Sequence, residues 1–310
     1  MSLDPAYLDY PLRRRGMDHD LYAWSALHQR PPVAWPGGRT VAVAIVVALE
    51  YFPLTPSDTP FRAPGHMATP FPDFRHYTAR DYGTRRGMPR LLDAFAAVGA
   101  RVSVAANAAA CERNPELIAR ILADGHEIVA HSTDMNGTIA GGLAEADERA
   151  LIVGAHDRIR AATGVAPAGW LSIARSQSWN TPRLLAEAGF DYMLDWVNDE
   201  LPYRFGALTN LPLNHELSDR QVIGVQQQSA ESYVEQLSDA FDWLAAEAAE
   251  SGGGRLLPVH LTPYIIGLPY RIDALERWLG ALAARRETWF APAGEIVAAW
   301  TRQAEPATGA

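Results

Sequence analysis

The unbroken apolar run from Val41 to Leu49 constrains the fold of this chain more than any other segment. It is rich in β-branched residues and ends at Glu50, which is typical of a strand buried on both faces. After it, short strand-like runs alternate with segments of helical spacing, and such alternation predicts a parallel sheet with right-handed crossovers. About seven strand–helix units favour a distorted (β/α) barrel of about seven parallel strands, with an open doubly wound sheet as the alternative.

The same pattern places the other elements. Further strands are expected at 102–106, 127–131, 168–172, 192–195, 256–261 and 289–291. Helices are expected at 88–98, from 114 to 124, and at 144–163, 180–189, 229–250, 272–285 and 294–300. Residues 51–81 are rich in proline and show no clear period, so they are expected to form a long loop, and loops of that length in compact domains are usually functional.

Three parts of the chain are distinguished by composition. Residues 1–40 carry aromatic side chains among prolines and glycines, which predicts an arm packed on the domain. Residues 41–303 are expected to form a single catalytic barrel domain, because no linker divides them. Residues 304–310 are expected to be a disordered tail.

Charge and composition exclude several classes of partner. The formal net charge of −9 gives no electrostatic reason to bind nucleic acid or an anionic membrane. The longest apolar run is too short to cross a bilayer, and the N-terminus lacks the apolar core of a signal peptide. Cys111 is the only cysteine, so an intramolecular disulfide is impossible. We therefore expect a cytoplasmic protein.

Polar and ionisable residues gather where the predicted strands end. Parallel strands share one face at their carboxyl ends, which is where barrel enzymes keep their chemistry. A carboxylate at the end of an apolar strand is costly unless it has a partner. Any one of these residues alone could be a satisfied polar group of the core, but together they favour a functional site. The strand-end residues are Glu50, Asn107, His131, Ser172 with Arg175, Asp195 with Trp196, and His260.

These strand ends resemble the motifs of the polysaccharide deacetylase (NodB homology) superfamily. The resemblance covers roughly residues 40–300. It rests on Ala48-Leu49-Glu50-Tyr51, Gly125–Asn136, Gly169–Ser176, Asp191–Trp196 and Leu256–Leu261. It implies a NodB-type barrel with Glu50 as general base held by Arg175, and His260 as general acid oriented by Asp195.

Two of the family's three metal ligands are replaced in this chain. Tyr51 stands where the family has a metal-binding aspartate, and Met135 stands where it has the second histidine. A catalytic zinc site usually has three protein ligands and an open position. His131, with Asp134 as a possible substitute ligand, falls short of that number, so we expect no cofactor. A divalent metal such as zinc, bound by His131 and Asp134, is the alternative.

The same two replacements are typical of the cofactor-independent allantoinases, a branch of this superfamily. Further shared segments are Arg113–Glu116, Asp199–Tyr203 and Ile266–Arg271. The resemblance implies hydrolysis of a carbon–nitrogen bond in a small ureide or amide, and a homo-oligomer. The branch has a pair of glutamates where this chain has Glu50-Tyr51, so a sister group with another small amide is equally open.

A small-molecule substrate needs a lined pocket and a group that stabilises the oxyanion. The side chains expected to bind it are His131, Trp196, Asn198, Trp170 and Tyr203, although core packing is the simpler explanation for Trp170. His66, His76 and His215 are left without a role.

Two other functions stay open on the sequence alone. One is a metal-dependent deacetylase of N-acetylated sugars. The other is a non-catalytic small-molecule binding protein on the same barrel, because a fold does not guarantee a reaction.

Overall fold

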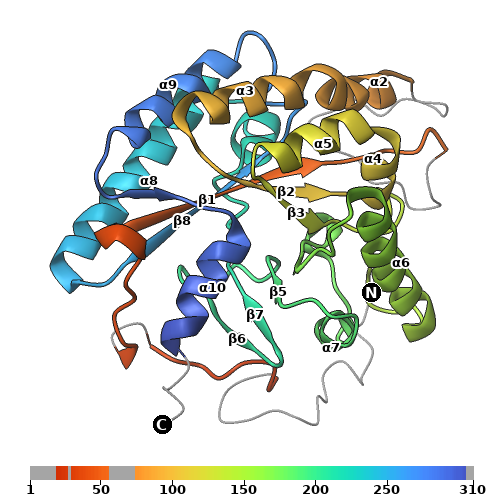
Figure 1. Cartoon of the computed structure of the whole chain (residues 1–310), viewed down its shortest axis with the longest axis horizontal. Coiled ribbons are helices and arrows are strands. Elements are labelled where there is room, and N and C mark those ends of the chain that lie inside the picture. Colours follow the sequence, from red (N-terminus) through yellow and green to blue (C-terminus); the bar gives the residue numbers. More distant parts are fainter. Residues whose placement is uncertain (1–18, 27–28, 56–73, 305–310) are drawn as a thin grey trace.

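The computed structural model describes residues 19–26, 29–55 and 74–304 (Figure 1). Its centre is a nine-stranded sheet in the order β6-β7-β5-β4-β3-β2-β1-β8, with β9 paired to β1. All pairings are parallel except that of β6 with β7. The strands are β1 Val41–Leu49, β2 Ser103–Ala106, β3 Glu127–Ala130, β4 Gly169–Trp170, β5 Tyr192–Met193, β6 Tyr203–Phe205, β7 Leu208–Asn210, β8 Arg255–Leu261 and β9 Thr288–Phe290.

Helices surround this sheet, which curls into a half-barrel (Figure 1). The two end strands, β6 and β8, do not pair with each other within the described part of the chain, so the barrel stays open between them. The predicted α/β class and distorted barrel are confirmed. The helices are α2 Phe74–Tyr82, α3 Met88–Val98, α4 Ala108–Arg113, α5 Pro115–Ala123, α6 Glu145–Thr163, α7 Thr181–Glu187, α8 Ala230–Ser251, α9 Ile272–Ala283 and α10 Ala293–Ala304.

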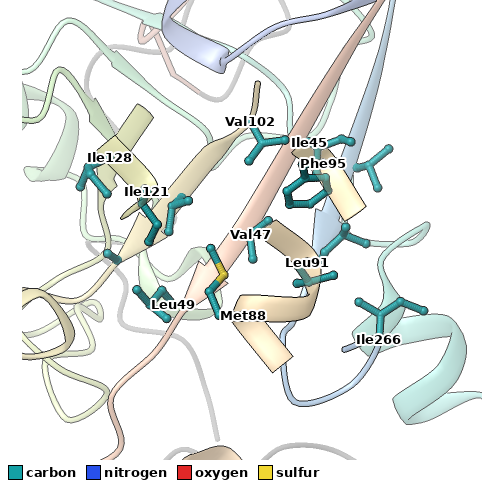
Figure 2. Packing of buried hydrophobic residues seen from close by; sticks show 14 of the residues in the cluster. Ile45, Val47, Leu49, Met88, Leu91, Phe95, Val102, Ile121, Ile128 and Ile266 are labelled. Atoms are coloured by element: carbon teal, nitrogen blue, oxygen red, sulfur yellow. The ribbon is translucent and has the colours of Figure 1, made fainter. Parts of the chain in front are cut away.

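Strand β1 is buried on both faces, as its unbroken apolar run predicts. Side chains alternate across a strand, so its residues divide between two clusters. Ile45, Val47 and Leu49 face the outer helices and pack near Met88 and Leu91 of α3 (Figure 2). On the other face, Ala42, Ala44 and Val46 belong to a second cluster together with residues of α10. Helix α10 therefore fills the concave side, and the strand ends at Glu50.

A kinked helix braces the loop that follows β8. A π-helical turn at Gly83–Gly87 joins α2 to α3. A Cβ added at Gly87 would lie 2.1 Å from the carbonyl oxygen of Pro263, and one at Gly83 would lie 2.9 Å from the backbone nitrogen of Tyr264. Glycine at both positions lets the helix backbone approach this loop closely. The loop that carries Tyr264 is thereby fixed against the rest of the domain.

Most predicted elements occur within two or three residues of their expected bounds, but three features differ. Helix α2 begins at Phe74, inside the segment expected to be a loop, and residues 56–73 lie outside the described residues. Helix α4 follows β2 directly and was not expected. Strands β6 and β7 form an antiparallel hairpin through Gly206, where no strand was assigned.

The described part of the N-terminal segment contacts the barrel. The indole Nε1 of Trp35 donates a hydrogen bond to the carbonyl oxygen of Arg255 at 2.7 Å, and Trp35 is buried. The division into an arm, a catalytic domain and a tail stays a prediction, and residues 305–310 lie outside the described residues. Within the described residues, no helix is both long and apolar enough to cross a membrane.

Candidate active site

The carboxyl ends of β1, β3 and β8 bring Glu50, His131 and His260 to one cavity. The cavity has a volume of about 280 Å³. All three side chains are buried, with 7%, 3% and 8% of their surface exposed. Of the described residues, those that line it are Glu50, His131, Leu171, Ser172, Ala174, Arg175, His215, Ser218, Arg220, Gln221, Val225 and His260.

Glu50 is held by Arg220 and Tyr264. The Nη2 of Arg220 donates to both carboxylate oxygens, at 2.8 and 2.9 Å. The hydroxyl of Tyr264 donates to Oε2 at 2.9 Å and accepts from the same Nη2. Sequence reasoning gave this role to Arg175, and the structure corrects it: Arg175 comes from the other side of the cavity and donates to the carbonyl oxygen of Leu213.

The surroundings of Glu50 keep it ionised. Burial alone raises the pKa of a carboxyl group, but the positive charge of Arg220 above all, together with the hydrogen bond from Tyr264, outweighs it. The net effect holds the pKa of Glu50 far below its usual range. Burial lowers the pKa of Arg220, but the charge of Glu50, the hydrogen bond to it and the neighbouring Tyr264 and Asp219 together outweigh burial, so the pKa is raised. A carboxylate this firmly paired is a weak proton acceptor.

His131 presents an acceptor nitrogen beside this carboxylate. Its Nδ1 lies 2.7 Å from the carbonyl oxygen of Leu171, which can only accept, so Nδ1 carries the proton. In the neutral ring Nε2 then has a free lone pair. That Nε2 lies 3.8 Å from Oε1 of Glu50. The negative charge of Glu50 would stabilise the imidazolium formed when Nε2 takes up a proton.

His260 has the opposite arrangement. Its Nδ1 lies 3.5 Å from Nη2 of Arg175, and a guanidinium can only donate, so Nδ1 accepts and Nε2 carries the proton of the neutral ring. Burial, and then the charges of Arg175 and Arg220, lower the pKa of His260 well below its usual value. The ring is therefore neutral, and its Nε2 has no hydrogen-bond partner among the described residues.

Asp195 was expected to orient His260, but its hydrogen bonds go elsewhere. Its Oδ1 accepts from the backbone N–H of Ser172 at 2.7 Å, and its Oδ2 accepts from the Ser172 hydroxyl at 2.9 Å and from Nε2 of Gln177. Burial raises its pKa despite these bonds. Asp195 fixes the turn that leads to Arg175, so its link to His260 passes through Arg175.

The backbone around the cavity is strained at three positions. Ser132, Ala174 and Arg175 have φ angles of 62°, 54° and 55°, although none is glycine. Such left-handed residues are uncommon outside glycine and cluster at functional sites. Ser132 follows His131 directly, and the other two residues form the turn that delivers the Arg175 side chain to the cavity.

Four of the five residues expected to bind substrate lie outside the cavity lining. Trp170 is fully buried and donates its Nε1 hydrogen to the Ser172 hydroxyl at 2.8 Å. Trp196 and Tyr203 pack against Tyr22 of the N-terminal segment, and Asn198 bonds to the hydroxyls of Tyr22 and Tyr203. Tyr203 lies on β6, whereas Trp196 and Asn198 lie in the segment between β5 and β6. Of the set, only His131 lines the cavity.

Two residues that sequence reasoning missed, Arg220 and Tyr264, make the main contacts to Glu50. Arg220 begins an irregular π-helical segment, Arg220–Val225, and Tyr264 lies in the turn after β8. The sequence around these two residues has no periodic pattern from which their place in the site could be predicted. His215 lines the cavity, whereas His76 is absent from its described lining and His66 lies outside the described residues.

The residues of the site do not fit a divalent metal. The oxygens of Glu50 are held by Arg220, and the guanidinium of Arg113 lies 4.4 Å from the centre of the Tyr51 ring. Asp134, the possible substitute ligand, is not among the lining residues and accepts the backbone N–H of Asn136 at 2.8 Å. Over the described ranges, no three acidic, histidine or cysteine side chains gather around one point. A dication would face guanidinium groups instead of three ligands.

Comparisons with known proteins agree with the fold and the motifs. Residues 72–193 match the family model described as polysaccharide deacetylase. A probable polysaccharide deacetylase from Pseudomonas aeruginosa PAO1 is 29% identical, over 88% of this chain and 95% of its own, with a TM-score of 0.75. The PuuE allantoinase is 27% identical, over 93% and 98%, with a TM-score of 0.80. No curated protein matches significantly. Residues 72–193 therefore carry a polysaccharide deacetylase domain by the family model, and the solved structures similar to the whole chain include polysaccharide deacetylases and the PuuE allantoinase.

Proposed function

We propose that this protein is a hydrolase that cleaves a carbon–nitrogen bond in a small ureide or amide without a metal. The observation that carries the proposal is a cavity of about 280 Å³ with an ionised carboxylate and two imidazoles of opposite hydrogen-bonding character. Its volume is at the small end for ligand pockets, which suits a small molecule better than a polymer. The likeness to the PuuE allantoinase supports the same substrate class.

Hydrolysis of an amide needs a base for water, a proton for the leaving nitrogen and charge stabilisation for the oxyanion. His131 Nε2 takes a proton from water as the water oxygen bonds to the carbonyl carbon. The same proton then passes to the nitrogen as the carbon–nitrogen bond breaks. The ionised Glu50 stabilises the imidazolium in between. This assignment differs from Glu50 acting as base, because Arg220 lowers the basicity of that carboxylate.

The remaining groups, His260 and Arg175, stabilise the negative charge of the oxyanion. His260 lines the cavity and is neutral, and its Nε2 hydrogen has no acceptor among the described residues, so it serves as a hydrogen-bond donor to the developing oxyanion. Arg175 lines the same cavity, adds positive charge and fixes the His260 tautomer. The general-acid role expected for His260 requires a charged ring, which this environment opposes. Asp195 acts through Arg175 as a positioning residue.

The experiment that tests the function is a substrate panel of allantoin, other ureides and cyclic amides, with N-acetylated glucosamine oligomers as the second arm. We expect release of the hydrolysed product from at least one small ureide or amide. Turnover must be lost in His131→Asn and retained in His156→Asn, a half-buried histidine on α6. Turnover of the N-acetylated sugars alone would favour the deacetylase instead. A homo-oligomer is also proposed, to be checked by light scattering.

A further inference from the structure

A second cavity lies against the other side of the Glu50–Arg220 pair. It has a volume of about 690 Å³, and it is bounded by α2, the Arg220–Val225 segment and the loop after β8. Arg220 and Tyr264, which hold Glu50, also line this cavity, whereas Glu50 and His131 do not. We name it the arginine cavity, after Arg75, Arg80, Arg220 and Arg271, which line it.

The charge of the arginine cavity is one-sided. Four arginines line it, and its described lining contains no aspartate or glutamate. The chain as a whole carries a formal net charge of −9, so this concentration of positive charge runs against the average of the molecule. Among the described residues, Arg75, Arg80 and Arg271 form no ion pair with a carboxylate. Like charges held together without a counterion repel one another.

Arg80 is the informative member of this set. Only 5% of its surface is exposed, and its Nε has no hydrogen-bond partner among the described residues. Its Nη1 donates to the carbonyl oxygen of His76, and its guanidinium stacks 4.4 Å from the ring centre of Phe52. These contacts orient the group but leave its charge uncompensated, and a buried charge without a counterion is costly.

Arg271 and Arg75 flank Arg80. Arg271 is fixed by a hydrogen bond from Nη1 to the carbonyl oxygen of Ile265 at 3.0 Å, and it stacks on the ring of Tyr270. Arg75 lies on the exposed side of α2, one turn or so before Arg80. Planar guanidinium groups that are oriented in advance are well suited to carboxylate and phosphate groups.

We infer that the arginine cavity binds a small organic anion through a carboxylate or phosphate group. The volume admits a molecule larger than a simple ion. The ligand would supply the negative charge that the lining lacks. It would also contact the side of Arg220 remote from Glu50, which places it next to the catalytic cavity without occupying it. This site does not depend on the reaction proposed for the smaller cavity.

The test is isothermal titration calorimetry of the whole chain with succinate and, separately, inorganic phosphate, at low ionic strength so that screening stays weak. Two variants are compared. The double variant Arg75→Gln/Arg271→Gln changes two residues that are not fully buried, and the single variant Arg80→Gln changes the buried arginine. The matched control is Arg86→Gln, an exposed arginine of the same helical region that is absent from the described lining. Circular dichroism checks that each variant is folded.

We expect the wild type and Arg86→Gln to bind at least one of the two anions with equal affinity. The double variant should bind it about tenfold more weakly or worse, since hydrogen bonds to charged groups are worth about 1.5–3 kcal/mol. Tighter binding of succinate would assign a carboxylate ligand, and tighter binding of phosphate a phosphorylated one. The inference is overturned if neither anion binds the wild type, or if the double variant binds as well as the control. Arg80→Gln supplies the same comparison at the buried position.

Discussion

The backbone N–H of Met135 donates a hydrogen bond to the carbonyl oxygen of Tyr51 at 3.0 Å. These are the two positions at which the family motifs would carry metal ligands, so the two replacements lie side by side in space. Arg113 stacks on the Tyr51 ring and Arg220 holds Glu50, so positive side chains lie next to both motif positions. A metal ion would bring positive charge to this place, and the two guanidinium groups already supply positive charge there.

Restoring the ligands should therefore restore metal binding. Tyr51→Asp/Met135→His would give His131 two new partners and reach three protein ligands. We expect this double variant to bind zinc in a calorimetric titration, more weakly than ordinary zinc enzymes because Arg113 and Arg220 remain. The wild type and the single variants are the controls. Equal zinc affinity in the wild type would show that the replaced positions never decided metal binding.

The Glu50–Arg220 pair should behave as a coupled buried unit. Arg220→Met leaves a buried carboxylate without its partner, and removing one member of a buried pair typically costs about 3–5 kcal/mol. Glu50→Gln/Arg220→Met removes both charges and should recover most of that loss. Urea unfolding of the wild type, both single variants and the double variant measures the coupling. Additive effects would mean that Arg220 does not hold Glu50 in solution.

Catalysis should need the charge of Glu50 and the lone pair of His131. Glu50→Gln keeps the shape but removes the charge that stabilises the imidazolium, and general acid–base contributions are about 10²–10⁴-fold. We expect losses of that order in kcat for Glu50→Gln and for His131→Asn. Glu112→Gln, a partly exposed glutamate paired with Arg158, is the control for loss of a carboxylate. Full activity in folded Glu50→Gln would remove Glu50 from the mechanism.

The strand ends could be predicted from the sequence because an unbroken apolar run indicates a buried strand. Glu50, His131 and His260 follow such runs, and the structure brings them together. The partners of Glu50 could not be predicted, because Arg220 and Tyr264 come from irregular segments whose positions depend on tertiary packing. Trp196 and Tyr203 were misplaced for the same reason: they lie before and on β6, where the sequence has no clear alternation, and they pack against Tyr22 of the N-terminal segment.

Stability should depend on pH through Asp219, which immediately precedes Arg220. Burial raises the pKa of Asp219 to about 7, above the 3.8 of an aspartate in the unfolded chain. Between these two values the folded chain binds a proton that the unfolded chain does not. Asp219 therefore contributes stability that is fully present below pH 3.8 and is lost as the pH rises through about 7.

Chemical denaturation from pH 4 to 8 measures this effect. The contribution of one proton has a slope of at most about 1.4 kcal/mol per pH unit. Asp219→Asn keeps an oxygen for the backbone N–H of Thr262, which Asp219 accepts at 2.7 Å. We expect this variant to be more stable than the wild type at pH 8, with a flatter profile. An unchanged profile would show that Asp219 does not titrate in this range.

We propose that the Glu50–His131–His260 cavity hydrolyses its substrate without a metal. The most direct test of this proposal is turnover of the ureide or amide substrate found in the panel, measured with and without dipicolinate on protein whose metal content is known by elemental mass spectrometry. We predict a metal content far below one per chain and the same kcat in chelator. Loss of activity in chelator, with recovery on adding zinc, would contradict the account and require His131 to be a metal ligand.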